Sequence, residues 1–276
     1  MNSYEQYDQT SAHYDLTRWP VGIEIIVGCL AQGWTPLAAQ TVLDAGCGTG
    51  NYSAALLDHV GRIIAVDRSS GMLATARRKL ALATTDGRAE FAQASIDALP
   101  LPDASVDGVM VNQVLHHLPD DAGAGYPRHR HVLQELARVL RPGGALVVNS
   151  CSHAQIQDGY WPYHLIPGAR AAVIQRLMPL DQLEAALGGS GVTPKGRFVP
   201  VDAVLQGADY FDPRGPLRPD WRAGDSIWAL AERDYASAER RLHELDRQGE
   251  LNAYLARHDA PRRKIGQITL LYGVKS

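Results

Sequence analysis

The sequence predicts an α/β fold in which a mostly parallel sheet carries helices on both faces. Two observations predict it. Short apolar runs alternate with helical patterns between residues 41 and 150, and these runs are continuous instead of alternating with polar residues. Continuous apolar strands are typical of parallel sheets, because the crossover helices bury both faces of the sheet.

The first expected strand is TVLDA at 41–45, and six further runs bring the number of expected strands to seven. The six later strands are expected at 61–67, 89–94, 106–112, 145–150, 196–206 and 266–275. The main helices are expected at 51–60, 69–83, 131–140, 180–192 and 225–258. Serines suited to capping begin the helix at 69–83. Pro142 and the glycines after it end the helix at 131–140.

The order of these elements divides the chain of 276 residues into three parts. Residues 1–37 are expected to form a helical N-terminal cap. Residues 38–206 and 263–276 form the α/β core, and 207–262 form a helical insertion between the last two strands. We expect this insertion to be a lid over the ligand-binding edge of the sheet. There it would shape the pocket for the substrate. A glycine-containing loop at 119–130 is expected beside the site.

Composition excludes several classes of function. The net charge of −3 gives no general attraction to nucleic acid or to anionic membranes. The three cysteines, Cys29, Cys47 and Cys151, are too widely spaced for a disulfide framework or a zinc motif, so no metal is expected. The apolar run at 21–31 is too short to span a bilayer. We therefore expect a cytoplasmic protein that partners neither nucleic acid nor membrane. Nothing in the sequence indicates an oligomeric state.

The loop after the first strand, DAGCGTG, points to a ligand without phosphates. It lacks the lysine of a phosphate-binding P-loop, and Gly46, Gly48 and Gly50 have a closer spacing than a dinucleotide fingerprint. Asp44, just before the glycines, would repel a pyrophosphate and attract an ammonium group. Asp67 ends the second strand, where a carboxylate can accept hydrogen bonds from both hydroxyls of a ribose. A ribose and an amino-acid end without phosphates describe S-adenosylmethionine.

Four segments then carry a resemblance to a known family. VLDAGCGTG, AVDRSSGML, ASIDALPLPDASVDGVMVNQVLHHL and ELARVLRPGG resemble, in order and spacing, the motifs of class I S-adenosylmethionine-dependent methyltransferases, which have a Rossmann-like fold. The resemblance covers about residues 40–150. The segment HYDLTRWP at 13–20 also looks like the helical cap of that family.

The resemblance implies roles for individual residues. Asp44 and the backbone of residues 46–50 would hold the methionine part of the cofactor, and Asp67 would hold the ribose. Ser95 stands where the family often has an acid, so adenine recognition departs from the usual pattern at this position. The other residues expected to contact the cofactor are Tyr14 and Arg18 in the cap, Arg68, Met72, Ile96 and Asn112.

The resemblance also implies methyl transfer to a small-molecule acceptor by in-line displacement. An oxygen or nitrogen acceptor is favoured, and a carbon acceptor stays open because similar sequences include quinone-ring C-methyltransferases. His117 and His153 are the candidate catalytic residues, with a packing role as the alternative. The aromatic run at 160–164 is either an acceptor-binding wall or lid packing.

Two other functions remain open at this stage. The first is an NAD(P)-dependent oxidoreductase on a Rossmann-like fold, against which the glycine spacing and Asp44 count. The second is a cofactor-binding protein without catalysis, against which the intact motif counts.

Overall fold

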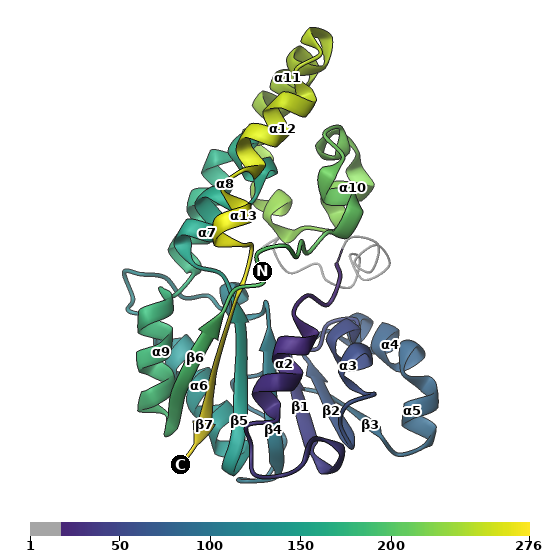
Figure 1. Ribbon diagram of the computed structural model, residues 1–276, viewed down its shortest axis with the longest axis vertical. Coiled ribbons are helices and arrows are strands. Elements are labelled where there is room, and N and C mark those ends of the chain that lie inside the picture. Colours follow the sequence, from purple (N-terminus) through teal and green to yellow (C-terminus); the bar gives the residue numbers. More distant parts are fainter. Residues whose placement is uncertain (1–17) are drawn as a thin grey trace.

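The computed structural model describes residues 18–276, which are built around a seven-stranded sheet (Figure 1). The strand order is β3-β2-β1-β4-β5-β7-β6. The first five strands in this order are parallel, and β7 is antiparallel to both of its neighbours. The bounds are β1 Thr41–Ala45, β2 Arg62–Asp67, β3 Ala89–Gln93, β4 Val106–Asn112, β5 Leu140–Ser150, β6 Val192–Phe198 and β7 Thr269–Lys275. The predicted α/β fold with a mostly parallel sheet is confirmed.

The alternation of side chains along each strand divides the core into two layers. Val42 faces one layer and its neighbour Leu43 the other, and both are fully buried. Apolar side chains of the flanking helices complete each layer, as Leu30 and Leu136 do on opposite faces. These helices are α2 Ile23–Leu30, α3 Asn51–Leu56, α4 Ser70–Lys79, α5 Ala81–Thr85, α6 Pro127–Val139 and α9 Leu180–Gly189.

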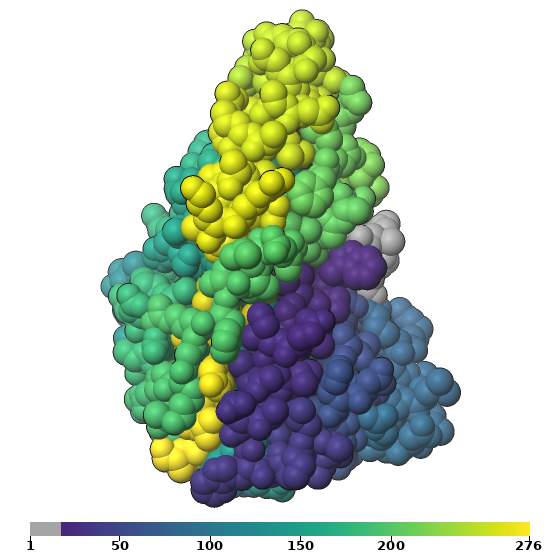
Figure 2. All heavy atoms as spheres, viewed as in Figure 1, coloured from purple at the N-terminus to yellow at the C-terminus, as the bar shows by residue number. Residues whose placement is uncertain are grey.

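A second group of helices, the helical layer, lies beyond the carboxyl ends of the parallel strands (Figure 1). It contains α7 His153–Asp158, η4 Trp161–Leu165, α8 Pro167–Arg176, η5 Gly207–Phe211, η6 Gly215–Leu217, α10 Pro219–Ala223, η7 Ser226–Leu230, α11 Glu232–Gln248, α12 Leu251–Asp259 and α13 Arg262–Ile265. The layer thus draws on residues 153–176 as well as on the expected insertion. Figure 2 shows it as a narrow protrusion above the broader sheet region.

Aromatic side chains hold the helical layer together. Trp161 is fully buried, and its indole N–H donates to the Tyr210 carbonyl oxygen at 2.7 Å. The Tyr210 hydroxyl in turn donates to Asp259 Oδ1 at 2.8 Å, and Asp259 accepts from the guanidinium of Arg262. Buried tyrosine and tryptophan are stable in such a layer because each polar end has a partner.

The structure corrects the predicted boundaries of four segments. The strand expected at 196–206 begins at Val192 and ends at Phe198, and the chain then crosses to the helical layer. The helix expected at 131–140 begins at Pro127, because proline is favoured in the first turn, where its missing N–H would have no helical partner. The loop expected at 119–130 is therefore shorter, because residues 127–130 belong to this helix. Strand β5 begins at Leu140, so Pro142 and its glycines lie inside a strand.

Gln155 in α7 joins the helical layer to the sheet. Its side chain is buried, and its amide nitrogen donates to the carbonyl oxygens of Ile265 at 2.8 Å and Ile268 at 2.9 Å. Its carbonyl oxygen accepts from the backbone N–H of Ser152 at 2.8 Å and from the Thr269 hydroxyl at 3.0 Å. One amide therefore satisfies four groups at the junction.

We predict that Gln155→Leu lowers the free energy of unfolding by about 1–3 kcal/mol, because buried donors and acceptors lose their partners. Urea denaturation would measure the change. Gln157→Leu is the matched control, since Gln157 lies exposed on the same helix. An equal loss in both variants would contradict the assigned role of Gln155.

Candidate functional site

Two adjoining pockets lie at the carboxyl edge of the parallel strands, where open α/β sheets bind ligands. The central pocket lies between the glycine loop and the helical layer, and the side pocket lies at the ends of β2 and β3. Residues common to both linings are Gly46, Gly48, Asn112, Gln113 and His117. The two pockets therefore form one site with a shared junction.

The glycine loop needs glycine for its backbone conformation. Gly46 and Gly48 have φ of 78° and 55°, a region that side chains disfavour. The backbone N–H groups of Gly46 and Cys47 both donate to the Val66 carbonyl oxygen, at 2.7 and 2.9 Å. A Cβ on Gly48 would meet no atom within 4 Å, so the loop is open on this side.

Gly50 has a different position from the one expected. It is the N-cap residue of α3 and lines neither pocket. Its φ is 79°, and a Cβ there would lie 3.0 Å from the Cβ of Ala76 in α4. The structure therefore gives Gly50 a role in helix packing in place of the predicted contact with the cofactor.

Asp44 has a buried carboxylate with one oxygen that lacks a hydrogen-bond partner among the described residues. Its Oδ2 accepts a hydrogen bond from the Ser53 hydroxyl at 2.6 Å, whereas its Oδ1 has no hydrogen-bond partner within residues 18–276. Burial, together with the negative charge of Asp67, raises the pKa of Asp44 to about 7. An ammonium group bound beside Oδ1 would satisfy this oxygen and stabilise the charged carboxylate.

Asp67 joins the glycine loop to the end of β2. Its Oδ2 accepts from the backbone N–H of Gly48 at 2.9 Å, and its Oδ1 accepts from that of Ser69 at 2.8 Å. Burial raises the pKa of this carboxyl as well. Asp67 lines the side pocket and presents its carboxylate at the place that was expected for a ribose.

The other residues expected to contact the cofactor divide between the pockets. Arg68, Met72, Ser95 and Ile96 line the side pocket with Asp67. Asn112 lines the junction, and neither polar atom of its buried side chain has a hydrogen-bond partner in the described part of the chain. The remaining two are in the cap: Arg18 lines the central pocket, and Tyr14 lies outside the described residues.

The two candidate catalytic histidines are separated. His117 lies with His116 in η3 Leu115–His117, and both line the central pocket, with ring centroids 4.0 Å apart. Burial lowers the pKa of His116 to about 4 and holds that of His117 well below its usual range. Both imidazoles are therefore neutral at pH 7. His153 lines neither pocket, and its Nε2 donates to the Leu177 carbonyl oxygen at 2.8 Å.

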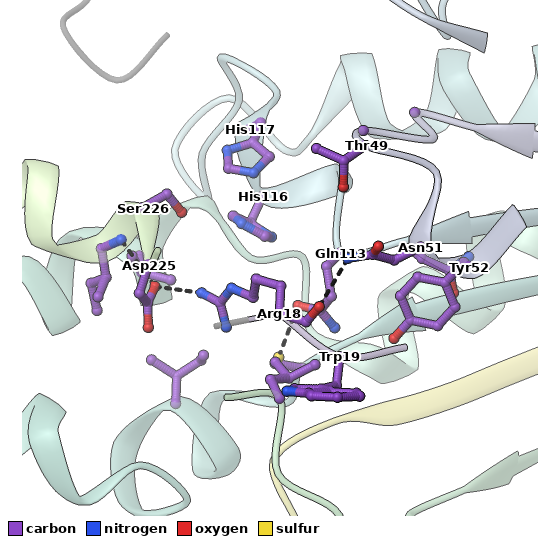
Figure 3. Close-up of a pocket in the computed structure, with 18 of the residues that line it drawn as sticks. Arg18, Trp19, Thr49, Asn51, Tyr52, Gln113, His116, His117, Asp225 and Ser226 are labelled. Carbon is purple, nitrogen blue, oxygen red and sulfur yellow. Dashed lines mark hydrogen bonds and ion pairs between the residues drawn. The ribbon is translucent and has the colours of Figure 1, made fainter. Parts of the chain in front are cut away.

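An ion pair across the central pocket was missed at the sequence level. Arg18 Nη2 lies 2.7 Å from Asp225 Oδ1 (Figure 3). Asp225 Oδ2 also accepts from the Tyr163 hydroxyl at 2.9 Å and from the Gln206 amide at 3.1 Å. The pair joins the N-terminal segment to the helical layer. Asp225 is remote in sequence from every motif, so only the path of the chain places it here.

Apolar and aromatic side chains line the rest of the central pocket. Tyr160 and Tyr163 stack with centroids 4.5 Å apart, and the Tyr160 hydroxyl donates to the Gln267 carbonyl oxygen at 3.1 Å. The apolar residues of the lining are Ile156, Val173, Leu177, Leu205 and Ile227. Tyr160 and Tyr163 of the aromatic run at 160–164 therefore line the pocket, whereas Trp161 packs within the helical layer.

Neither a metal site nor a membrane-spanning helix occurs among the described residues. Within residues 18–276, no group of three or more His, Cys, Asp or Glu side chains is arranged to hold a metal ion. In the same part of the chain, no helix combines the length and apolar character needed to cross a membrane.

Comparison with known proteins identifies similar chains. Residues 43–148 match a family described as a methyltransferase domain. A demethylmenaquinone methyltransferase of Clavibacter sepedonicus is 34% identical over 51% of this chain and 55% of its own length. A trans-aconitate 2-methyltransferase of an Azoarcus species is 37% identical over 48% of this chain and 50% of its own. The chain thus spans about half the length of these curated relatives.

A solved structure matches over more of the chain. Its description assigns the protein to an antibiotic biosynthesis pathway of Anabaena variabilis as a methyltransferase. This chain matches it with a TM-score of 0.72 and a sequence identity of 23%. The match covers 93% of this chain and 98% of the other. At this identity the likeness establishes the shared fold.

The raised pKa of Asp44 makes ligand affinity depend on pH. Below pH 7 the free carboxyl is mostly protonated and must lose its proton to bind an ammonium group. The Kd of S-adenosylhomocysteine should therefore rise by up to about tenfold per pH unit below pH 7, and level off above it. Calorimetric titration between about pH 5.5 and 8 measures this dependence.

Asp44→Asn should bind the same ligand more weakly and with a flat pH profile across this range. Asp86→Asn, at an exposed position, is the control and should keep the wild-type slope. An unchanged slope in Asp44→Asn would assign the titration to another group.

Proposed function

We propose that this chain is a class I, Rossmann-like S-adenosylmethionine-dependent methyltransferase, and that it transfers a methyl group to a small-molecule acceptor at oxygen or nitrogen. The observation that carries this proposal is Asp44. Its buried carboxylate has an unpaired oxygen beside the open glycine loop, and there an ammonium group fits while a pyrophosphate does not. The small-molecule substrates in the names of the relatives also support the acceptor class.

The residues that would hold the cofactor follow from the two pockets. Asp44 and the backbone of Gly46 and Gly48 would bind the methionine part in the central pocket. Asp67 would bind the ribose hydroxyls, and Met72, Ser95 and Ile96 would surround the adenine in the side pocket. The unpartnered amide of Asn112 at the junction supplies a further donor and acceptor.

The cofactor supplies a methyl group that is already activated by its sulfonium. The protein therefore mainly needs to align an acceptor with that methyl group and to exclude water. The apolar wall around Val173 and Leu177 and the helical layer above it serve the second purpose. The neutral imidazole of His117 is able to accept the proton that an O–H or N–H acceptor loses, and solvent then removes it.

The negative net charge supports an acceptor other than nucleic acid. A cytoplasmic location remains our expectation. The insertion at 207–262 is proposed as a lid, since Asp225 and Ile227 from this segment line the central pocket.

Calorimetric titration tests the proposed cofactor directly. We expect S-adenosylhomocysteine to bind with a micromolar or lower Kd and NAD to show no saturable binding. Binding of NAD alone would overturn the proposal in favour of an oxidoreductase. Transfer of label from methyl-labelled S-adenosylmethionine to any member of a panel of phenols, alcohols and amines would exclude a cofactor-binding protein without catalysis.

The two histidines should differ in the same assay. His117→Ala should lower kcat by about 10²-fold, because the imidazole that accepts the proton is lost from the junction. His153→Ala should change kcat by less than about twofold, since its imidazole faces the Leu177 carbonyl outside both pockets. Equal losses in the two variants would refute the separate roles that the structure supports.

A further inference from the structure

Gln113 lies at the junction of the two pockets, where we expect methyl transfer to occur. It follows β4 directly and lines both pockets. We propose that Gln113 is a specificity-determining residue for uncharged protic acceptors, and that its Oε1 accepts a hydrogen bond from the O–H or N–H group to be methylated. This inference rests on the proposed function, because it assumes that the cofactor spans the two pockets.

The location of the methyl group follows from the chemistry of the cofactor. The sulfonium joins the methionine part to the adenosine part, so the methyl group must lie where the two pockets meet. Two of the five residues at this junction are glycines, and Asn112 is buried in the last position of β4. The other two, Gln113 and His117, follow the strand and carry side chains that can reach an acceptor. Figure 3 shows both of them in the central pocket, with His116 between His117 and the Arg18 side chain in this view.

A hydrogen-bond chain determines which end of the Gln113 amide faces the pocket. The Tyr52 hydroxyl donates to the Val21 carbonyl oxygen at 3.2 Å and accepts from the Val21 N–H at 3.2 Å. Since a hydroxyl has one proton to donate, the Asn149 group that contacts it at 3.1 Å must be the amide nitrogen. The Asn149 oxygen therefore accepts from Gln113 Nε2 at 2.8 Å.

This direction leaves the carbonyl oxygen of Gln113 on the side of Cys151, which also lines the central pocket. Its contact among the described residues is the thiol of Cys151, whose Sγ lies 3.6 Å from Oε1. Burial raises the pKa of this thiol to about 11, so it keeps its proton and acts as a weak donor. A carbonyl oxygen has two lone pairs, so Oε1 has capacity for one stronger donor.

The backbone at Gln113 is held in an uncommon conformation. Gln113 has φ of 56°, in the left-handed region that residues other than glycine seldom adopt, and its N–H donates to the Asn149 carbonyl oxygen at 3.0 Å. Ala104 and Tyr126 are the other described residues of this kind, and neither lines a pocket. Such strain is typical of functional sites, where the surrounding structure maintains it.

The hydrogen bond to Oε1 would direct a lone pair of the acceptor toward the methyl carbon. That lone pair forms the new bond while the carbon–sulfur bond breaks and its electron pair goes to sulfur. An amide is too weak a base to keep the proton, which passes to the neutral imidazole of His117 and then to solvent. An aprotic group would leave the half-buried Oε1 without this donor, and a carboxylate would be repelled by it.

The test compares phenol with toluene, two probes of similar size that differ in one donor group. Saturation-transfer NMR on the protein loaded with S-adenosylhomocysteine would give the Kd of each probe. The ratio of the two affinities should fall by about 3–10-fold in Gln113→Met, which removes the oxygen. The ratio should stay at the wild-type value in Gln157→Met, an exposed control.

Gln113→Glu is the second variant, because it retains an acceptor oxygen and should preserve the preference for phenol. The Kd of S-adenosylhomocysteine, measured on each variant, verifies that the site is folded. An unchanged phenol preference in Gln113→Met with the cofactor product still bound overturns this inference alone. Failure of the wild-type protein to bind S-adenosylhomocysteine overturns the proposed function, and this inference with it.

Discussion

The two hydrogen bonds to the Asp67 carboxylate are the interaction on which the rest of the site depends. One oxygen accepts from Gly48 in the loop after β1, and the other accepts from Ser69 at the cap of α4. This single side chain therefore joins two neighbouring strand ends and holds the glycine loop open. This loop conformation leaves space for the two pockets and for the junction between them.

The charges of the site are arranged for a cation. Asp44 is buried and Asp67 is half-buried near one loop, and each has a raised pKa because burial disfavours its negative charge. The arginine of the central pocket, Arg18, is paired with Asp225 and so supplies no excess positive charge there. A positively charged ligand would compensate the charges of the two carboxylates. An uncharged ligand would suit the part of the central pocket where Arg18 and Asp225 already neutralise each other.

Local features were sufficient to predict the sheet and the loop, and they failed where the outcome depended on distant contacts. The strand at 41–45 has the predicted bounds because its apolar run and the glycines after it are local signals. The strand at 196–206 was misplaced, because its pairing with β7 determines where it begins and ends. Gly50 was expected at the ligand, but packing against Ala76 explains its glycine.

The sequence by itself determined the fold class, the order of the motifs and the two carboxylates at the strand ends, because each of these depends on spacing along a short segment. Only the tertiary structure decided which side chains share the central pocket. It brought His117 into the lining and left His153 bonded to the Leu177 carbonyl. It also paired Asp225 with Arg18 and placed the Gln113 oxygen beside the Cys151 thiol, because these positions depend on contacts between residues far apart in the sequence.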